Sequence, residues 1–87
     1  MATVVLPRSL IALFPLAPRR VSLTGGTVRD LVDALDAGWP GMRDRLCDPG
    51  PVLREFINVY VDGEPADLSS VVTDGSVVHL LPAVAGG

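Results

Sequence analysis

A single amphipathic helix among short β segments is the feature that most constrains this fold. The apolar stripe of that helix is Val28, Leu31, Val32 and Leu35. These positions follow the i, i+3, i+4, i+7 spacing of one helix face. Thr27 is placed to act as N-cap, with Asp30 as the acidic partner of a capping box, and Gly38 supplies a stop signal. One apolar stripe has to be buried against one sheet face, which predicts a two-layer α+β domain.

Four short segments have the composition of strands. They are rich in β-branched and aromatic residues and are separated by turn-forming residues. The segments are residues 3–6, 20–23, 56–61 and 77–81. Asp62-Gly63 and Asp74-Gly75 are turn signals, and Pro82 should halt the last strand because proline has no N–H for a ladder.

Two further segments are rich in proline. Residues 10–18 are apolar but carry Pro15 and Pro18, which favours a broad hairpin connection over a helix. Residues 39–54 carry three prolines and two glycines, so we expect a connector with one helical turn at residues 42–46. A ferredoxin-like arrangement would need a second substantial helix. The pattern therefore favours a β-grasp fold, a mixed sheet of four to five strands packed on one main helix.

Size and charge disfavour several functional classes. A chain of 87 residues leaves room for one core but little volume to enclose a catalytic cleft, which favours a carrier over an enzyme. A net charge of -3 argues against a nucleic-acid partner, which requires clustered cations. No apolar run reaches membrane-spanning length, and Pro7, Arg8 and Pro15 interrupt any secretory signal. We therefore expect a cytoplasmic protein without a membrane partner.

The side chains offer no obvious catalytic or metal-binding constellation. The single cysteine, Cys47, is expected to be packed rather than reactive. Asp30, Asp33 and Asp36 recur every third residue, a spacing typical of a solvated helix face rather than of a metal site. All seven basic residues are arginines, which excludes lysine-linked chains of this protein on itself. We expect no metal and no bound cofactor.

The last five residues are the candidate working part of the chain. Residues 83–87 carry no side-chain charge and nothing bulkier than valine, so we expect a flexible tail beyond a domain of residues 1–82. Five extended residues reach roughly 17 Å. Because Gly86 and Gly87 have no Cβ, the tail can enter a narrow channel and its terminal carbonyl can be approached from either face. These are properties of an acyl carrier with Gly87 as the reacting residue.

Several segments carry a family resemblance. Residues 74–87 resemble the ending of the family formed by the molybdopterin-synthase small subunit and the thiamine sulfur carrier. Residues 56–63 resemble its central strand and turn, residues 27–31 are similar to its helix start, and residues 40–46 lie where its connector would lie. The resemblance implies a ubiquitin-like β-grasp fold. It also implies that a ubiquitin-activating-type adenylyltransferase and sulfurtransferase consumes ATP to convert the Gly87 carboxylate into a thiocarboxylate, which then donates sulfur to a biosynthetic enzyme.

The branch of the family is less sharply defined. Residues 54–61 and 81–87 look most similar to carriers of cysteine biosynthesis. The small subunit of molybdopterin synthase is the runner-up, and a sulfur donor for another metabolite remains open. Two other classes are a ubiquitin-like modifier joined through Gly87 to a target lysine, and a purely structural ubiquitin-like interaction module.

Strand parity predicts where partner enzymes dock. If Ile57, Val59 and Val78 face the helix, the alternate residues lie on the open face of the sheet. An exposed apolar patch beside the tail root is typical of a docking site, unless the proline-rich segments cover it. The predicted partner-binding residues are Phe56, Asn58, Tyr60, His79 and Leu81 on the sheet, and Pro82, Ala83, Val84 and Ala85 along the tail.

Overall fold

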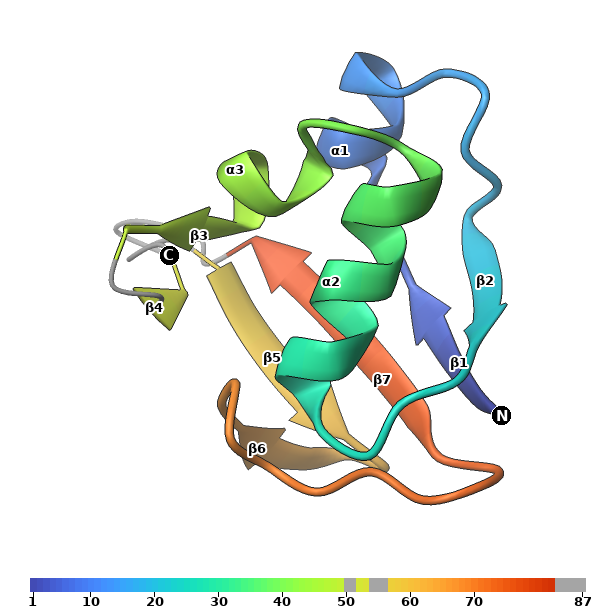
Figure 1. Ribbon diagram of the computed structural model, residues 1–87, viewed down its shortest axis with the longest axis vertical. Helices are drawn as coiled ribbons and strands as arrows, with labels where there is room; N and C mark the ends of the chain where they lie inside the picture. The colour runs from blue at the N-terminus through green and yellow to red at the C-terminus, as the bar shows by residue number, and fades with distance from the viewer. Residues whose placement is uncertain (50–51, 54–56, 83–87) are drawn as a thin grey trace.

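A five-stranded sheet with one long helix across one face forms the body of the protein (Figure 1). The computed structural model describes residues 1–49, 52–53 and 57–82. Its elements in chain order are β1 (Ala2–Val5), α1 (Arg8–Leu13), β2 (Arg20–Leu23), α2 (Val28–Gly38), α3 (Met42–Leu46), β3 (Cys47–Asp48), β4 (Val52–Leu53), β5 (Ile57–Val61), β6 (Glu64–Ala66) and β7 (Val77–Pro82).

The last strand lies at the centre of the sheet. The strand order is β2-β1-β7-β5-β6, so β7 lies between β1 and β5. It pairs parallel to β1, with Thr3 opposite Val77, and antiparallel to β5, with Tyr60 opposite His79. β1 and β2 form an antiparallel hairpin at one edge, and β6 pairs antiparallel with β5 at the other. This mixed sheet is the β-grasp topology, as predicted.

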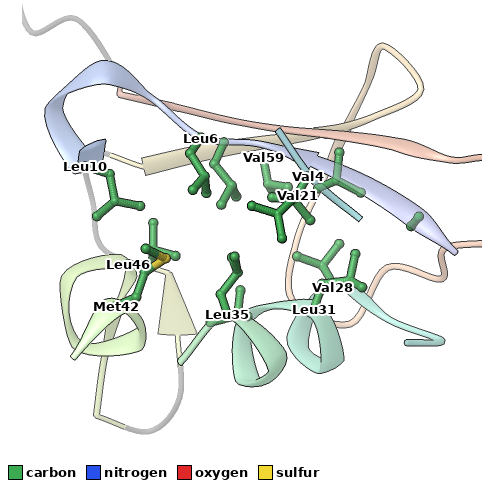
Figure 2. Close-up of a cluster of buried hydrophobic side chains, with 14 of the residues drawn as sticks. Val4, Leu6, Leu10, Val21, Val28, Leu31, Leu35, Met42, Leu46 and Val59 are labelled. Carbon is green, nitrogen blue, oxygen red and sulfur yellow. The ribbon is translucent and has the colours of Figure 1, made fainter. Parts of the chain in front are cut away.

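The predicted helix stripe is confirmed as the centre of the core. All four stripe residues of α2 are at most 2% exposed. In Figure 2, Val28, Leu31 and Leu35 point from α2 toward side chains of the sheet. Leu35 lies beneath Val59 and Val21 in this view. The capping box is also confirmed. The backbone N–H of Asp30 donates to Thr27 Oγ1 at 3.2 Å, and the N–H of Thr27 donates to Asp30 Oδ2 at 3.2 Å.

The expectation that residues 10–18 contain no helix is wrong. α1 occupies Arg8–Leu13 and buries Leu10 to 5% exposure. The helix ends at Phe14, whose backbone is non-helical and whose N–H bonds the carbonyls of Leu10 and Ile11. Pro15 constrains only the residue before it, so it ends this helix without preventing it.

Three short strands were not predicted. β6 contains Pro65, which is tolerated because β6 is an edge strand. β3 and β4 form a separate two-stranded sheet within the connector, directly after the predicted helical turn, which is confirmed as α3. β7 also includes Pro82, which lies opposite Ile57, one residue beyond the predicted end of the strand.

Asp30 and Asp33 are solvent-exposed, as predicted for this helix face, while Asp33 and Asp36 also bind Arg43. Arg43 Nη1 lies 2.9 Å from Asp33 Oδ1, and Arg43 Nη2 lies 3.5 Å from Asp36 Oδ2. Asp36 Oδ1 accepts the backbone N–H groups of Gly41 and Arg43 at 3.1 and 3.0 Å. The hydrogen bond that Arg43 donates to Asp33, followed by the charge of Asp36, raises the pKa of Arg43. These contacts tie α2 to α3, and Asp30 serves the capping box.

Candidate functional site

The root of the tail is held at the centre of the sheet. Pro82 is the last described residue, and it lies opposite Ile57 at the end of β7. β7 pairs with β1 as far as His79 and with β5 as far as Pro82, so the last residue before the tail belongs to a central strand. The predicted reacting residues Gly86 and Gly87 lie outside the described residues, as do Ala83, Val84 and Ala85.

The strand parity predicted for β5 and β7 is confirmed. Val59, Val78 and Leu80 are at most 2% exposed and belong to the core. The alternate residues lie on the other side of the sheet, where they pair across strands as Asn58 with Leu81 and Tyr60 with His79. We call these four residues, Asn58, Tyr60, His79 and Leu81, the open face. Phe56, also predicted there, lies outside the described residues.

The open face is accessible at its tail end. Leu81 is 41% exposed and Asn58 is exposed, whereas Tyr60 and His79 are half-buried. The described parts of the proline-rich segments therefore leave the Asn58–Leu81 pair open. In Figure 1, α2 and α3 cover the opposite side of the sheet. An exposed leucine next to a tail root is a suitable contact for a partner protein.

The described residues form no cluster of side chains that could bind a metal ion. No three His, Cys, Asp or Glu side chains among residues 1–49, 52–53 and 57–82 gather to hold a metal ion. Cys47 is 7% exposed and packs into the core, as predicted. None of the described helices is both long and apolar enough to cross a bilayer.

A hollow of about 290 Å³ lies on the helix side of the tail root, and sequence reasoning missed it. We call it the tail-root hollow. Its lining residues are Pro7, Ser9, Leu10, Leu13, Arg45, Leu46 and Ile57. They come from α1 and its N-cap Pro7, from α3 and from the start of β5. No sequence signal indicated it, because α1 was expected to be a loop and the other walls are distant along the chain.

A second hollow of about 270 Å³ shares Leu13 with the first. Apart from the glycine, it is lined by apolar residues, namely Leu13, Phe14, Pro15, Leu16, Gly38, Trp39 and Pro40. It lies around the end of α1 and the end of α2, and Leu16 at its edge is 89% exposed.

The fold, together with the terminal Gly86-Gly87 pair, defines a ubiquitin-like protein of the β-grasp class. The chain belongs to the ThiS family, whose family model matches residues 8–87. The match runs through the glycine pair and confirms the family resemblance seen in the sequence.

Named relatives agree with this assignment. The sulfur carrier protein CysO of Mycobacterium tuberculosis is 37% identical over 75 residues, covering 79% of this chain and 81% of that protein. Small archaeal modifier protein 1 of Haloferax volcanii is 36% identical over 69 residues, covering 78% of this chain and 79% of that protein.

Solved structures confirm the fold. A chain in the crystal structure of the Amycolatopsis orientalis BexX/CysO complex superposes with a TM-score of 0.87 at 34% identity, covering 100% of both chains. The crystal structure of Mycobacterium tuberculosis CysO superposes with a TM-score of 0.85 at 33% identity, covering 97% of this chain and 100% of that chain.

Proposed function

We propose that this chain is a sulfur carrier whose reacting group is the carboxylate of Gly87. The observation that carries the proposal is the ThiS-family match through residue 87, together with the CysO relative named as a sulfur carrier. The position of the tail root supports it, because a tail anchored on a central strand emerges from a fixed point of the fold. The chain then acts as a co-substrate of other enzymes rather than as a catalyst.

The first step makes the terminal carboxylate reactive. A free carboxylate resists nucleophiles because its charge is delocalised and it has no good leaving group. A partner adenylyltransferase joins the Gly87 carboxylate to AMP from ATP and releases pyrophosphate. This carrier contributes the acyl group and a tail without a Cβ at its last two positions, so the partner enzyme has access to both faces of the carbonyl.

The second step installs sulfur. Hydrosulfide attacks the acyl carbon, the C–O bond to AMP breaks, and one proton is released to give the Gly87 thiocarboxylate. A persulfide donor does the same when a thiol then reduces the remaining S–S bond. The thiocarboxylate passes its sulfur to an acceptor enzyme. Cysteine biosynthesis is the first candidate pathway, since the named relatives in Mycobacterium and Amycolatopsis are CysO proteins.

Intact-mass spectrometry tests this function. The carrier is incubated with a ThiS-family activating enzyme, ATP and sulfide. The expected product is heavier by the replacement of one oxygen with one sulfur, and it forms only when ATP is present. An unchanged mass, with an activating enzyme shown to be active on its own carrier, would contradict the proposal.

A second candidate is a protein modifier, which the similarity to small archaeal modifier protein 1 favours. In that case, the activated Gly87 acylates a target lysine. The same incubation with cell extract distinguishes the two, because ligation adds the mass of a whole protein to the target. The molybdopterin-synthase alternative remains a prediction, since neither named relative carries that function in its name.

We further propose that the open face docks the activating enzyme. The change Leu81→Asp puts a charge on an exposed apolar residue that lies one residue before Pro82 at the tail root. We expect affinity for the activating enzyme to fall about tenfold or more, as is usual for a central apolar contact. Isothermal titration with the activating enzyme measures this.

Leu16→Asp is the matched control for this docking prediction. It makes the same change at a leucine that is 89% exposed and lies on the loop between α1 and β2. Its affinity should equal that of the unmodified carrier. Equal affinities for both variants, with both folded by circular dichroism, would exclude the open face as the docking site.

A further inference from the structure

The outer side of β2 is an open edge of the sheet. β2 is the first strand in the order β2-β1-β7-β5-β6, and none of the described strands pairs with its outer side. In Figure 1, no helix or strand is drawn beyond β2 on that side of the sheet. The opposite edge strand, β6, contains Pro65, which has no N–H to donate and discourages pairing with another chain. β2 contains no proline, so its edge keeps the capacity to pair.

The register with β1 determines which backbone groups of β2 point outward. The N–H of Leu6 donates to the carbonyl of Arg19 at 2.8 Å, one step beyond the paired residues of β1 and β2. Hydrogen-bonded and non-hydrogen-bonded pairs alternate along an antiparallel ladder. Arg19 and Val21 therefore direct their N–H and carbonyl groups toward β1, whereas Arg20 and Ser22 direct theirs toward the outer edge. No backbone hydrogen bond joins these outward groups to another described residue.

The side chains of β2 alternate between the two faces of the sheet. Val21 is buried on the helix side, whereas Arg20 and Ser22 are exposed on the side of the open face. Val5 pairs with Arg20 on one side and His79 on the other, which places Arg20 in the same row as His79. No ion pair joins Arg20 to another described residue. A segment paired with β2 can therefore place a carboxylate directly opposite this arginine.

The helix side of this edge has space for apolar side chains. Asp33 and Asp36 bind Arg43 of α3, so the opposite flank of α2, which carries Ala34 and Gly38, faces β2. Figure 1 shows α3 and β2 on opposite sides of α2. Both flank residues are small, and a Cβ added to Gly38 would meet no heavy atom within 4 Å outside its chain neighbours and its own helix backbone. Alternate residues of a paired segment can place β-branched side chains against this flank.

We propose that the outer edge of β2 binds an extended segment of a partner protein as an additional antiparallel strand. The segment alternates β-branched residues, which lie against α2, with polar residues on the side of the open face, and one of the polar residues is an acid opposite Arg20. Backbone hydrogen bonds to Arg20 and Ser22 provide affinity, and the cross-strand ion pair fixes the register. The orientation is antiparallel because antiparallel pairs are more stable per residue than parallel ones.

Charge favours a partner segment over a second copy of this chain. Two β2 strands paired with each other would bring Arg19 and Arg20 of both copies into one short ladder, and closely spaced like charges are destabilising. An acidic segment instead neutralises Arg20. Because β1 separates β2 from β7, a partner held at this edge leaves the tail root and the Asn58–Leu81 pair accessible. The site does not involve Gly87 and goes beyond the proposed function.

The synthetic peptide acetyl-Thr-Val-Thr-Val-Glu-Val-Glu-amide tests the pairing on the unmodified protein. Its third residue is designed to lie opposite Ser22 and its fifth opposite Arg20. Amide hydrogen exchange is measured by nuclear magnetic resonance with and without millimolar peptide. Exchange at Arg20 and Ser22 should slow by about tenfold or more, whereas Val21, already bonded to β1, should change little. Unchanged exchange at Arg20 and Ser22 would overturn the proposal, and so would protection that grows with protein concentration when no peptide is present.

Two N-methylated peptides test which edge of the peptide is used. Methylating the amides of the third and fifth residues, which should face β2, is expected to weaken binding by about tenfold or more, since two hydrogen bonds are lost. Methylating the second and fourth residues should preserve binding, because those amides face solvent. Fluorescence anisotropy of labelled peptides measures both affinities. Equal affinities of the two methylated peptides would contradict strand pairing at this edge.

Protein variants test the two residues that carry the proposal. Ser22→Pro removes an outward N–H without removing a bond to β1, so an edge strand should tolerate it while peptide affinity falls about tenfold. Arg20→Gln should weaken binding about threefold. Arg29→Gln, the same charge change at an exposed residue of α2, should leave it unchanged. Equal affinities for the two arginine variants would overturn the proposal, and the methylated peptides decide the pairing even if Ser22→Pro does not fold. None of these outcomes bears on whether Gly87 accepts sulfur.

Discussion

Deleting Gly86 and Gly87 is expected to abolish sulfur transfer while leaving the folded domain intact. The deletion moves the terminal carboxylate back by roughly 7 Å along an extended chain. A misplacement of about 1 Å already costs around 100-fold in many enzymes, so we expect a loss of about 1,000-fold or more. Thiocarboxylate formation is measured by intact mass, and the unfolding midpoint by circular dichroism should not change.

Two alanine variants test whether sulfur transfer depends on the length of the tail alone or also on the absence of Cβ atoms at its end. Gly87→Ala keeps the length and adds one Cβ at the reacting residue. The double change of Gly86 and Gly87 to alanine keeps the length and adds two. We expect intermediate losses, larger for the double variant. A truncated carrier that still gained sulfur at the normal rate would mean that the reacting group is not the one proposed.

The main layers of the fold could be predicted because their signals are local. The apolar stripe from Val28 to Leu35 defines a helix by its own spacing, and the capping box from Thr27 to Asp30 fixes where it begins. Alternation along Ile57–Val61 likewise defines which residues face the helix. Each pattern depends on a few neighbouring residues, so tertiary packing did not override it.

Proline accounts for most of what was missed. Pro15 was taken to disfavour a helix, yet it acts only on Phe14 and leaves α1 intact. Pro65 obscured β6, although Asp62-Gly63 is a strong hairpin signal and both residues adopt positive φ, 51° and 86°. An edge strand tolerates proline, but which strand lies at the edge is a property of the whole sheet.

Some features of the candidate site could also be predicted from local sequence, and others depend on long-range packing. Gly86 and Gly87 could be recognised from the sequence because their role belongs to the chain terminus itself. The open face followed from alternation, which the pairing of Tyr60 with His79 confirms. The tail-root hollow could not be found, since it depends on α1, α3 and the start of β5 meeting at one point. Side chains brought together by long-range packing leave no periodic trace in a sequence.

The largest effect on stability is expected from Leu35→Ala. Leu35 is 0% exposed and lies on the face of α2 that packs against the sheet, where β7 carries the tail root (Figure 2). Removing a buried leucine leaves a cavity and costs about 2–5 kcal/mol. For a domain of this size, that lowers the unfolding midpoint by roughly 10 °C or more. Thermal unfolding by calorimetry or circular dichroism measures the change.

Leu16→Ala is the matched control, because it deletes the same atoms from a side chain that is 89% exposed. Its free energy of unfolding should change by no more than about 0.5 kcal/mol. Equal destabilisation by both variants would contradict a core centred between α2 and the sheet. Because small domains have only about 5–15 kcal/mol of stability, a loss at Leu35 also reduces the fraction of carrier that presents its tail from a folded sheet. Sulfur transfer by Leu35→Ala should therefore fall with temperature in parallel with its unfolding curve.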